Sequence, residues 1–163
     1  MAEYLMGIDA GTGSVRVALF DFRGQNRAYA VAEYGTTYPK NGWAEQSDYE
    51  WFEALKKAIP ECIKKAGIAA DNIAAITCDA TTNTLVYLDE NDTSVRPPIL
   101  WMDVRATEEA SFIDTIREEY DATKFYKPGF RADTMVPKCM WVKKNEPENW
   151  AKTKTIMEFE DWL

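Results

Sequence analysis

Two short apolar stretches near the start of the chain constrain the fold more than any other feature, because very few residues connect them. Residues 4–8 and residues 15–20 have the composition of buried strands. Asp9 stands at the end of the first, and only residues 10–14 then lie between the two. A crossover between parallel strands needs about a dozen residues or more. The sequence therefore predicts an antiparallel hairpin.

The turn of this hairpin has the composition of an anion-binding loop. Gly11-Thr12-Gly13-Ser14 has little side-chain bulk, so its backbone amides and two hydroxyls can approach an anion closely. Asp9 is a natural outer ligand for a hydrated magnesium ion, and Arg16 can bind a phosphoryl oxygen. The turn opens a strand rather than a helix and lacks lysine, so it fits neither a dinucleotide-binding motif nor a P-loop. An ordinary glycine-rich hairpin turn remains the alternative.

Composition and charge exclude several other classes of function. The net charge of −8 argues against a protein that binds a nucleic-acid backbone. No apolar run is long enough to span a membrane and the first residues lack a secretory signal, so we expect a cytoplasmic protein. The chain has no histidine, and its three cysteines are widely separated. Histidine-dependent catalysis, zinc sites and a disulfide framework are therefore not expected, which leaves carboxylate, hydroxyl and magnesium chemistry.

The next part of the chain predicts a third strand, a helix and a central strand. A third strand over residues 28–34 completes a β-meander. Ser47 and Glu50 form a capping box that begins a helix, Pro60 is expected to kink it, and Gly67 ends it. The apolar run 73–78 then predicts a central strand covered on both faces.

Two polar segments follow the predicted strands. Residues 79–83, before a further strand at 84–88, carry hydrogen-bonding side chains of the kind that a polyhydroxylated ligand requires, although a turn would use similar residues. Asp103 and Arg105, after a short strand at 99–101, are either a surface ion pair or polar contacts at the mouth of a site. Both questions stay open at this point.

The remaining sequence predicts further helices and one strand. We expect helices over about 105–120 and 136–144, a break at Lys127-Pro128-Gly129, and a strand at 154–157. Residues 159–163 resemble the opening of a helix. Because a natural domain rarely ends inside such an element, we expect the chain to be a fragment of a longer protein.

Four segments, in order along the chain, resemble the FGGY family of carbohydrate kinases. Residues 7–16 resemble its first phosphate loop, and the others resemble its Pro-x-x-Gly-Trp-x-Glu-Gln, Trp-x-Asp-x-Arg and Pro-Lys-x-x-Trp-x-Lys segments: 38–46, 101–106 and 137–143. The element order and the resemblance imply an α/β, ribonuclease H-like (actin-like ATPase) fold. Its mixed sheet starts with an antiparallel β-meander and has flanking helices. Residues 1–163 would be the N-terminal portion of the first kinase domain, with the rest of that domain and the second domain absent.

The resemblance also assigns roles to residues. Asp9 would act on Mg²⁺, and the phosphates of ATP would face Gly11, Thr12, Gly13, Ser14 and Arg16. The sugar side would use Asp79, Ala80, Thr81, Thr82, Asn83, Trp101, Asp103, Arg105 and Asp133. The general base, an aspartate, is expected beyond Leu163, so no catalytic residue lies in the chain and the isolated fragment should be inactive.

The implied reaction is transfer of the γ-phosphoryl group of ATP to a sugar hydroxyl. Residues 79–82 and 133–138 are most similar to the corresponding segments of ribulose kinases, with Asp133 in place of a glutamate. The expected substrate is a ketopentose such as ribulose, or a related polyol, and a homodimer is the candidate assembly of the full-length protein.

Two alternatives remain. Another actin-like ATPase, such as a chaperone or filament protein, would share the opening turn but has no reason to carry Trp101, Asp103 and Arg105 together. A non-catalytic sugar-binding or regulatory module would carry a degenerate phosphate turn. The intact set from Asp9 to Arg16 favours the kinase.

Overall fold

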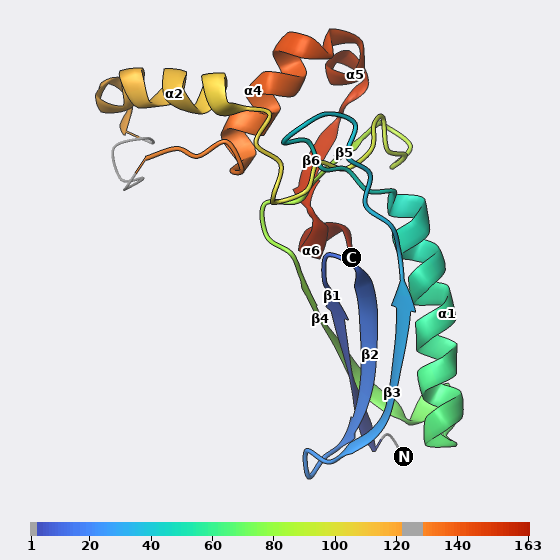
Figure 1. The fold of residues 1–163 in the computed structure, drawn as a ribbon. Coiled ribbons are helices and arrows are strands. Elements are labelled where there is room, and N and C mark those ends of the chain that lie inside the picture. The colour runs from blue at the N-terminus through green and yellow to red at the C-terminus, as the bar shows by residue number, and fades with distance from the viewer. Residues whose placement is uncertain (1–2, 122–128) are drawn as a thin grey trace. The chain divides into compact units, whose positions relative to one another are not determined.

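The computed structural model describes residues 3–121 and 129–163 and divides into two compact units. The first unit consists of residues up to Thr36 together with Ser47–Thr81 and the terminal Leu163, and the second of Thr37–Gln46 with Thr82–Trp162. Figure 1 shows the elements of each unit.

The first unit is built on a mixed four-stranded sheet in the order β3-β2-β1-β4. Its strands are β1 (Tyr4–Ala10), β2 (Ser14–Asp21), β3 (Asn26–Glu33) and β4 (Ile73–Ala80). The pairs β1–β2 and β2–β3 are antiparallel, whereas β4 runs parallel to β1. The predicted hairpin and β-meander are therefore confirmed.

Helix α1 (Asp48–Ala66) makes the crossover to β4 and packs against β2 and β3 (Figure 1). The Ser47 hydroxyl accepts a hydrogen bond from the backbone N–H of Glu50, as predicted. The Glu50 carboxylate instead accepts from the N–H of Gly35 at 3.1 Å, so it joins the helix to the end of the meander. Gly67 ends the helix with a φ of 68°, and the helix continues through Pro60. A short 3₁₀ turn, η1 (Ala70–Asn72), leads into β4.

The core of this unit lies between α1 and one face of the sheet. Side chains that point to opposite faces alternate along β2 and β3, and the buried set includes Val17, Leu19 and Ala30. Strand β4 is different from the prediction. It lies at the edge of the sheet, and most of its residues are exposed, including Ile76 at 58%. The expected cover on both faces is absent because α1 packs over β2 and β3, and the other described residues leave β4 open.

The second unit contains a small antiparallel sheet with helices around it. Its strands are β5 (Leu85–Leu88) and β6 (Thr155–Glu158). The helical elements are α2 (Thr107–Ile116), η2 (Arg117–Glu119), α4 (Met135–Asn145), α5 (Pro147–Lys152) and α6 (Phe159–Trp162). Its core includes Leu85, Tyr87, Ile99 and Val142.

The predicted elements of this unit agree closely with the observed ones, but helix α5 was not predicted and one predicted strand is absent. Residues 99–101 do not form a strand, since Ile99 makes only isolated bridges to Leu85 and Glu45. The predicted break at 127–129 falls largely outside the described residues, which exclude 122–128.

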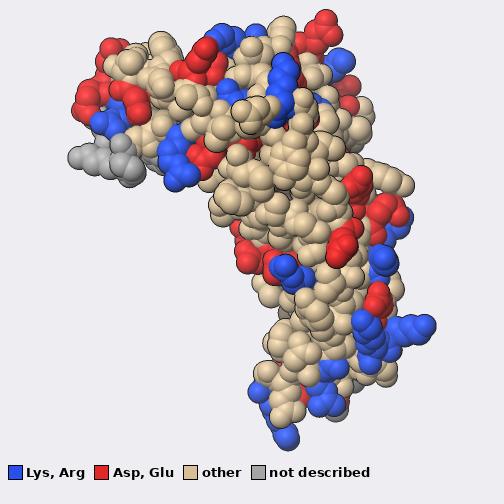
Figure 2. Space-filling model, viewed as in Figure 1, with Lys and Arg blue, Asp and Glu red and all other residues tan. Residues whose placement is uncertain are grey.

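Charged side chains of both signs are interspersed on the face drawn in Figure 2. Within the described ranges, no helix is both long and apolar enough to cross a membrane.

Candidate functional site

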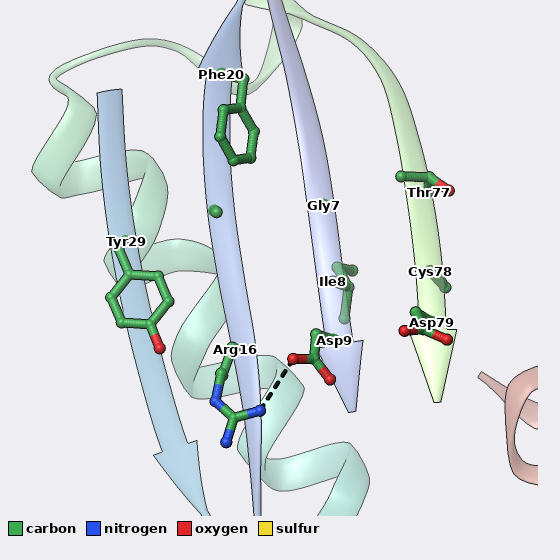
Figure 3. A pocket seen from close by; sticks show the side chains of 10 residues that line it. Gly7, Ile8, Asp9, Arg16, Phe20, Tyr29, Thr77, Cys78 and Asp79 are labelled. Carbon is green, nitrogen blue, oxygen red and sulfur yellow. Dashed lines mark hydrogen bonds and ion pairs between the residues drawn. The ribbon is translucent and has the colours of Figure 1, made fainter. Parts of the chain in front are cut away.

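Asp9 lies at the carboxyl end of β1, between a basic and an acidic residue on the two adjoining strands. Its register partners are Arg16 on β2 and Asp79 on β4. The Arg16 Nη1 atom is 2.9 Å from the Asp9 Oδ2 atom. Figure 3 shows the three side chains side by side near the strand ends. The sheet thus brings together one residue from each predicted group: metal, phosphate and sugar.

The electrostatics of this cluster fit a hydrated magnesium ion. Asp9 and Arg16 each expose about half of their side-chain surface, so their ion pair contributes little to stability. The hydrogen bond to Asp9 holds the pKa of the Arg16 guanidinium above its ordinary value. Asp9 and Asp79 are register partners on neighbouring strands, so their carboxylates are the acidic groups of this cluster that could hold a divalent cation. Mg²⁺ is typically bound by one or two carboxylates plus phosphates and waters, and the described residues hold no larger group of ligands.

The turn between β1 and β2 is closed by its own backbone and by Tyr34. The N–H of Gly11 donates to the Ser14 carbonyl at 3.0 Å, and the Tyr34 hydroxyl donates to the Gly11 carbonyl at 2.5 Å. Burial raises the pKa of Tyr34, so its hydroxyl remains a donor at neutral pH. Ser14 is buried, whereas Thr12 is partly exposed and Gly13 is exposed. Of the predicted phosphate-binding groups, the Gly11 amide and Ser14 are therefore internal to the turn.

A surface pocket of about 340 Å³ adjoins this cluster (Figure 3). Asp9, Arg16 and Asp79 supply its charged lining, and Phe20 and Tyr29 supply aromatic surface. Arg16 and Phe20 alternate along β2 with the buried residues that face α1, so the pocket lies on the opposite face of the sheet.

The chain passes from the first unit to the second within the predicted sugar segment. Residues 79–81 belong to the first unit, and Thr82 and Asn83 to the second. Asp79 and Ala80 end β4, and Asn83 adopts a left-handed conformation with a φ of 56°. Asparagine tolerates this conformation better than most residues, as expected for a turn.

In the second unit, Trp101 and Asp133 line one pocket of about 440 Å³. Trp101 exposes 43% of its surface. Both oxygens of Asp133 accept hydrogen bonds from Arg131, at 2.9 and 2.6 Å. Two residues predicted to bind sugar, more than thirty positions apart in the sequence, therefore share one surface cavity.

Asp103 and Arg105 are not in that position. Neither side chain has any exposed surface. The Asp103 carboxylate accepts hydrogen bonds from the backbone N–H of Ala44 at 2.7 Å, from the backbone N–H of Arg105, and from Nε and Nη2 of Arg105. A surface ion pair and a contact at the mouth of a site both require exposure, so burial corrects both predictions. The pair is part of the interior.

The comparison with known proteins decides the family. A model described as the FGGY family of carbohydrate kinases, N-terminal domain, matches residues 4–163. The chain belongs to this family.

Two FGGY relatives illustrate the similarity in sequence. The xylulose kinase of Lactococcus lactis subsp. lactis (strain IL1403) is 33% identical over 160 residues, which cover 98% of this chain and 32% of that protein. The glycerol kinase of Oleidesulfovibrio alaskensis is 31% identical over 158 residues, which cover 94% of this chain and 31% of that protein. The chain thus spans about a third of the length of these relatives.

Solved structures confirm the actin-like ATPase fold for part of a domain. A "xyloylose kinase" from Brucella ovis matches with a TM-score of 0.88 at 27% identity, covering 98% of this chain and 33% of that chain. The xylulose kinase of Rhodospirillum rubrum matches with a TM-score of 0.86 at 22% identity, again over 98% of this chain and 33% of that chain.

Three of the four FGGY segments meet in one buried network of the second unit. The Arg105 guanidinium lies over the ring of Trp43, from the second segment, at 3.9 Å, and 5.0 Å from the ring of Trp141, from the fourth. Glu45 accepts from Arg105 at 2.8 Å and from Arg96 at 2.6 Å. These segments therefore build part of the interior of the second unit.

The roles of Glu45, Arg96 and Lys138 in this interior were not predicted from the sequence. All three are charged residues that the fold buries, and a charge inside an otherwise ordinary loop or helix gives no local sign of burial. Their position within or near the FGGY segments was the sequence feature that could have indicated these roles.

Proposed function

We propose that the chain is the N-terminal part of an ATP-dependent kinase that phosphorylates a hydroxyl of a ketopentose or a related polyol. Membership of the FGGY family supports the reaction class. The observation that carries the proposal is the cluster of Asp9, Arg16 and Asp79 on one sheet face beside the glycine-rich turn. A purely structural sheet has no need of three exposed charged side chains side by side at the ends of adjoining strands.

Gly13 gives this proposal independent support. Its φ is not in the left-handed region, and a Cβ atom placed on it would have no heavy atom within 4 Å. The described chain therefore supplies no internal reason for glycine at this position. Close approach of a phosphate to the backbone would supply one. At Gly11, by contrast, a Cβ atom would lie 3.3 Å from Nη1 of Arg16, so glycine there leaves room for the arginine.

The chain's own groups would bind and orient the phosphates. Thr12 and Gly13 offer exposed turn surface, and Arg16 offers a fixed positive charge on the same face. Asp9 would hold Mg²⁺, with Asp79 beside it. The ion would neutralise charge on the transferred phosphoryl group. Positioning and charge neutralisation account for most of the rate in this class of reaction.

The sugar would lie against the wall formed by Trp101 and Asp133, with Thr82 and Asn83 of the same unit as further polar groups. An indole ring offers an apolar face, and a carboxylate accepts hydrogen bonds from hydroxyls, which suits a polyol. Asp103 and Arg105 would act from the interior by fixing the loop that carries Trp101. The relatives named xylulose kinase support a ketopentose, and the motifs at 79–82 and 133–138 favour ribulose among them.

The isolated chain is expected to be inactive, because the general base and the adenine pocket are proposed to lie outside it. The exposed apolar surface of β4 supports a role for further protein segments that cover this strand. Because the proposed reaction consumes ATP, we also propose that the protein is cytoplasmic.

The test is an ADP-release assay on the full-length protein with a panel of ribulose, xylulose, glycerol and gluconate. ADP release that depends on one of these substrates supports the kinase. ATP hydrolysis that is independent of any sugar would instead favour a different actin-like ATPase, and sugar binding without ADP release would favour a non-catalytic module. Ordinary kinase turnover by residues 1–163 alone would contradict the proposed location of the base.

A further inference from the structure

Lys138, on α4, is a buried charged residue that the proposed function has not yet used. Its side chain has no exposed surface. Its ammonium donates to the backbone carbonyls of Asn83 at 2.6 Å and Leu100 at 2.8 Å. Within the described part of the chain no carboxylate forms a salt bridge with it. A buried charge without a paired counter-ion is costly, so an apolar residue of similar volume would be expected here if only packing mattered.

The two carbonyls belong to two backbone segments that run together and then separate. Leu85 and Ile99 exchange backbone hydrogen bonds at 2.9 and 3.0 Å. Beyond that pair, the Thr84 Oγ1 atom accepts from the N–H of Trp101 at 3.2 Å. The Lys138 ammonium binds the two segments at the end of this contact, where one segment continues to Asn83 and the other to Trp101. The ammonium therefore fixes the separation of two segments that carry predicted sugar-binding residues.

The helix that carries Lys138 adds the third segment. The N–H of Lys138 lies 3.4 Å from the carbonyl of Thr134, in the first turn of α4, and Asp133 directly precedes Thr134. One side chain thus connects the backbones at Asn83 and Leu100 to the helix that begins beside Asp133. The bonds are charge-assisted, which makes them stronger and shorter than bonds between neutral groups.

We propose that Lys138 is a positioning residue for the sugar, which holds Asn83, Trp101 and Asp133 in one fixed arrangement without touching the substrate. This inference rests on the proposed kinase function. It accounts for a buried ammonium whose hydrogen-bond acceptors are the main chains of the proposed sugar wall.

The test compares Lys138→Met with Lys143→Met in the full-length protein. Both substitutions replace a lysine of α4 by methionine, but Lys143 is exposed. Methionine fills the space of Lys138 without its hydrogen bonds. For Lys138→Met we expect kcat/KM for the sugar to fall about 30- to 100-fold, because a displacement of about 1 Å can cost 100-fold, while KM for ATP changes less than about twofold. Lys143→Met should behave as the wild type.

A merely structural role predicts a different pattern. It would lower the thermal stability of Lys138→Met and change the kinetic constants for sugar and ATP alike. Under our proposal, removal of the buried charge should leave the melting temperature of Lys138→Met equal to or above that of the wild type. A kcat/KM for the sugar within twofold of the wild type would overturn the role of Lys138 alone. Absence of sugar phosphorylation by the wild type would refute the proposed function, and with it this inference.

A pH titration of the wild type covers the case in which Lys138→Met does not fold. Burial lowers the pKa of Lys138 to about 8, while the surrounding Asp103, Asp133 and Glu158 raise it and Arg105 lowers it. Burial raises the thiol pKa of the neighbouring Cys139, and the charge of Lys138 opposes this shift. Between pH 7 and 9.5 we expect KM for the sugar to rise at least about threefold as the ammonium loses its proton. A constant KM over this range would overturn the inference.

Discussion

Replacement of Asp103 by asparagine should destabilise the second unit strongly, because the substitution breaks a buried ion pair. The Asp103 carboxylate accepts four hydrogen bonds, three of them from Arg105. Asparagine is nearly isosteric but has no charge, and its NH₂ group faces N–H donors. Arg105 would keep Glu45 as a partner, but Glu45 also binds Arg96.

The magnitude follows from this geometry. Loss of one partner of a buried ion pair typically costs about 3–5 kcal/mol. One side-chain oxygen remains as an acceptor in the variant, so we expect a loss near 3 kcal/mol. With a urea m-value of about 1–3 kcal/mol/M, the unfolding midpoint should fall by roughly 1–3 M. This is a large share of the ordinary stability of a domain, about 5–15 kcal/mol.

Urea unfolding followed by tryptophan fluorescence is a suitable assay, because Trp43 and Trp141 flank Arg105. The matched control is Asp133→Asn, which breaks the pair with Arg131. The Arg131 side chain is 72% exposed, so this loss should stay below about 1 kcal/mol. An unfolding free energy of Asp103→Asn within 1 kcal/mol of the wild type would refute the structural role of Asp103 and restore a direct role at the sugar.

Three further predictions concern the phosphate turn, the loop before Ala44 and Lys138. Asp9→Asn should change the unfolding free energy by less than about 1 kcal/mol, since the ion pair of Asp9 is exposed. The same substitution should reduce kcat of the full-length protein by about 100-fold or more. Substantial remaining turnover at saturating Mg²⁺ would contradict the assignment of Asp9 to the metal. Gly42→Ala should lower the free energy of unfolding in urea by about 1–3 kcal/mol, because φ at Gly42 is 77° and the new Cβ would lie 3.0 Å from Val104 Cγ2. Gly13 has open space around it and no left-handed φ. Gly13→Ala should therefore leave the stability unchanged but weaken the use of ATP. The pKa of Lys138 in the folded chain, about 8, is below its ordinary value of 10.5, so between these pH values the unfolded chain binds the proton that the folded chain has released. The free energy of unfolding of the wild type should therefore rise relative to Lys138→Met from pH 8 to 10.5, and a flat difference would show that Lys138 is not desolvated.

Much of the fold could be predicted because its signals are local. The short connection between β1 and β2, the cap at Ser47 and the glycine after α1 each depend on residues a few positions apart. The turn chemistry from Asp9 to Arg16 was likewise visible in one continuous stretch. The environment of β4 could not be predicted in this way, because apolar composition does not tell which other segments cover a strand.

The residues around the proposed sugar site show more clearly what could not be predicted from the sequence. The sequence places an aspartate two residues before an arginine at positions 103 and 105, a spacing compatible with exposure or burial. Burial follows from contacts with Ala44 and Glu45, and the Ala44 contact spans 59 positions. The lysine at 138 finds its acceptor at Asn83 across 55 positions.

The sequence alone therefore determined the hairpin, the helix that follows Ser47, the family and the glycine-rich turn, since each is specified by neighbouring residues or by motifs in order. Only the tertiary structure decided which charged residues of those motifs are exposed and which hold the interior together. The physical reason is that the ionisation and hydrogen bonding of a buried side chain depend on groups that folding brings from distant parts of the chain.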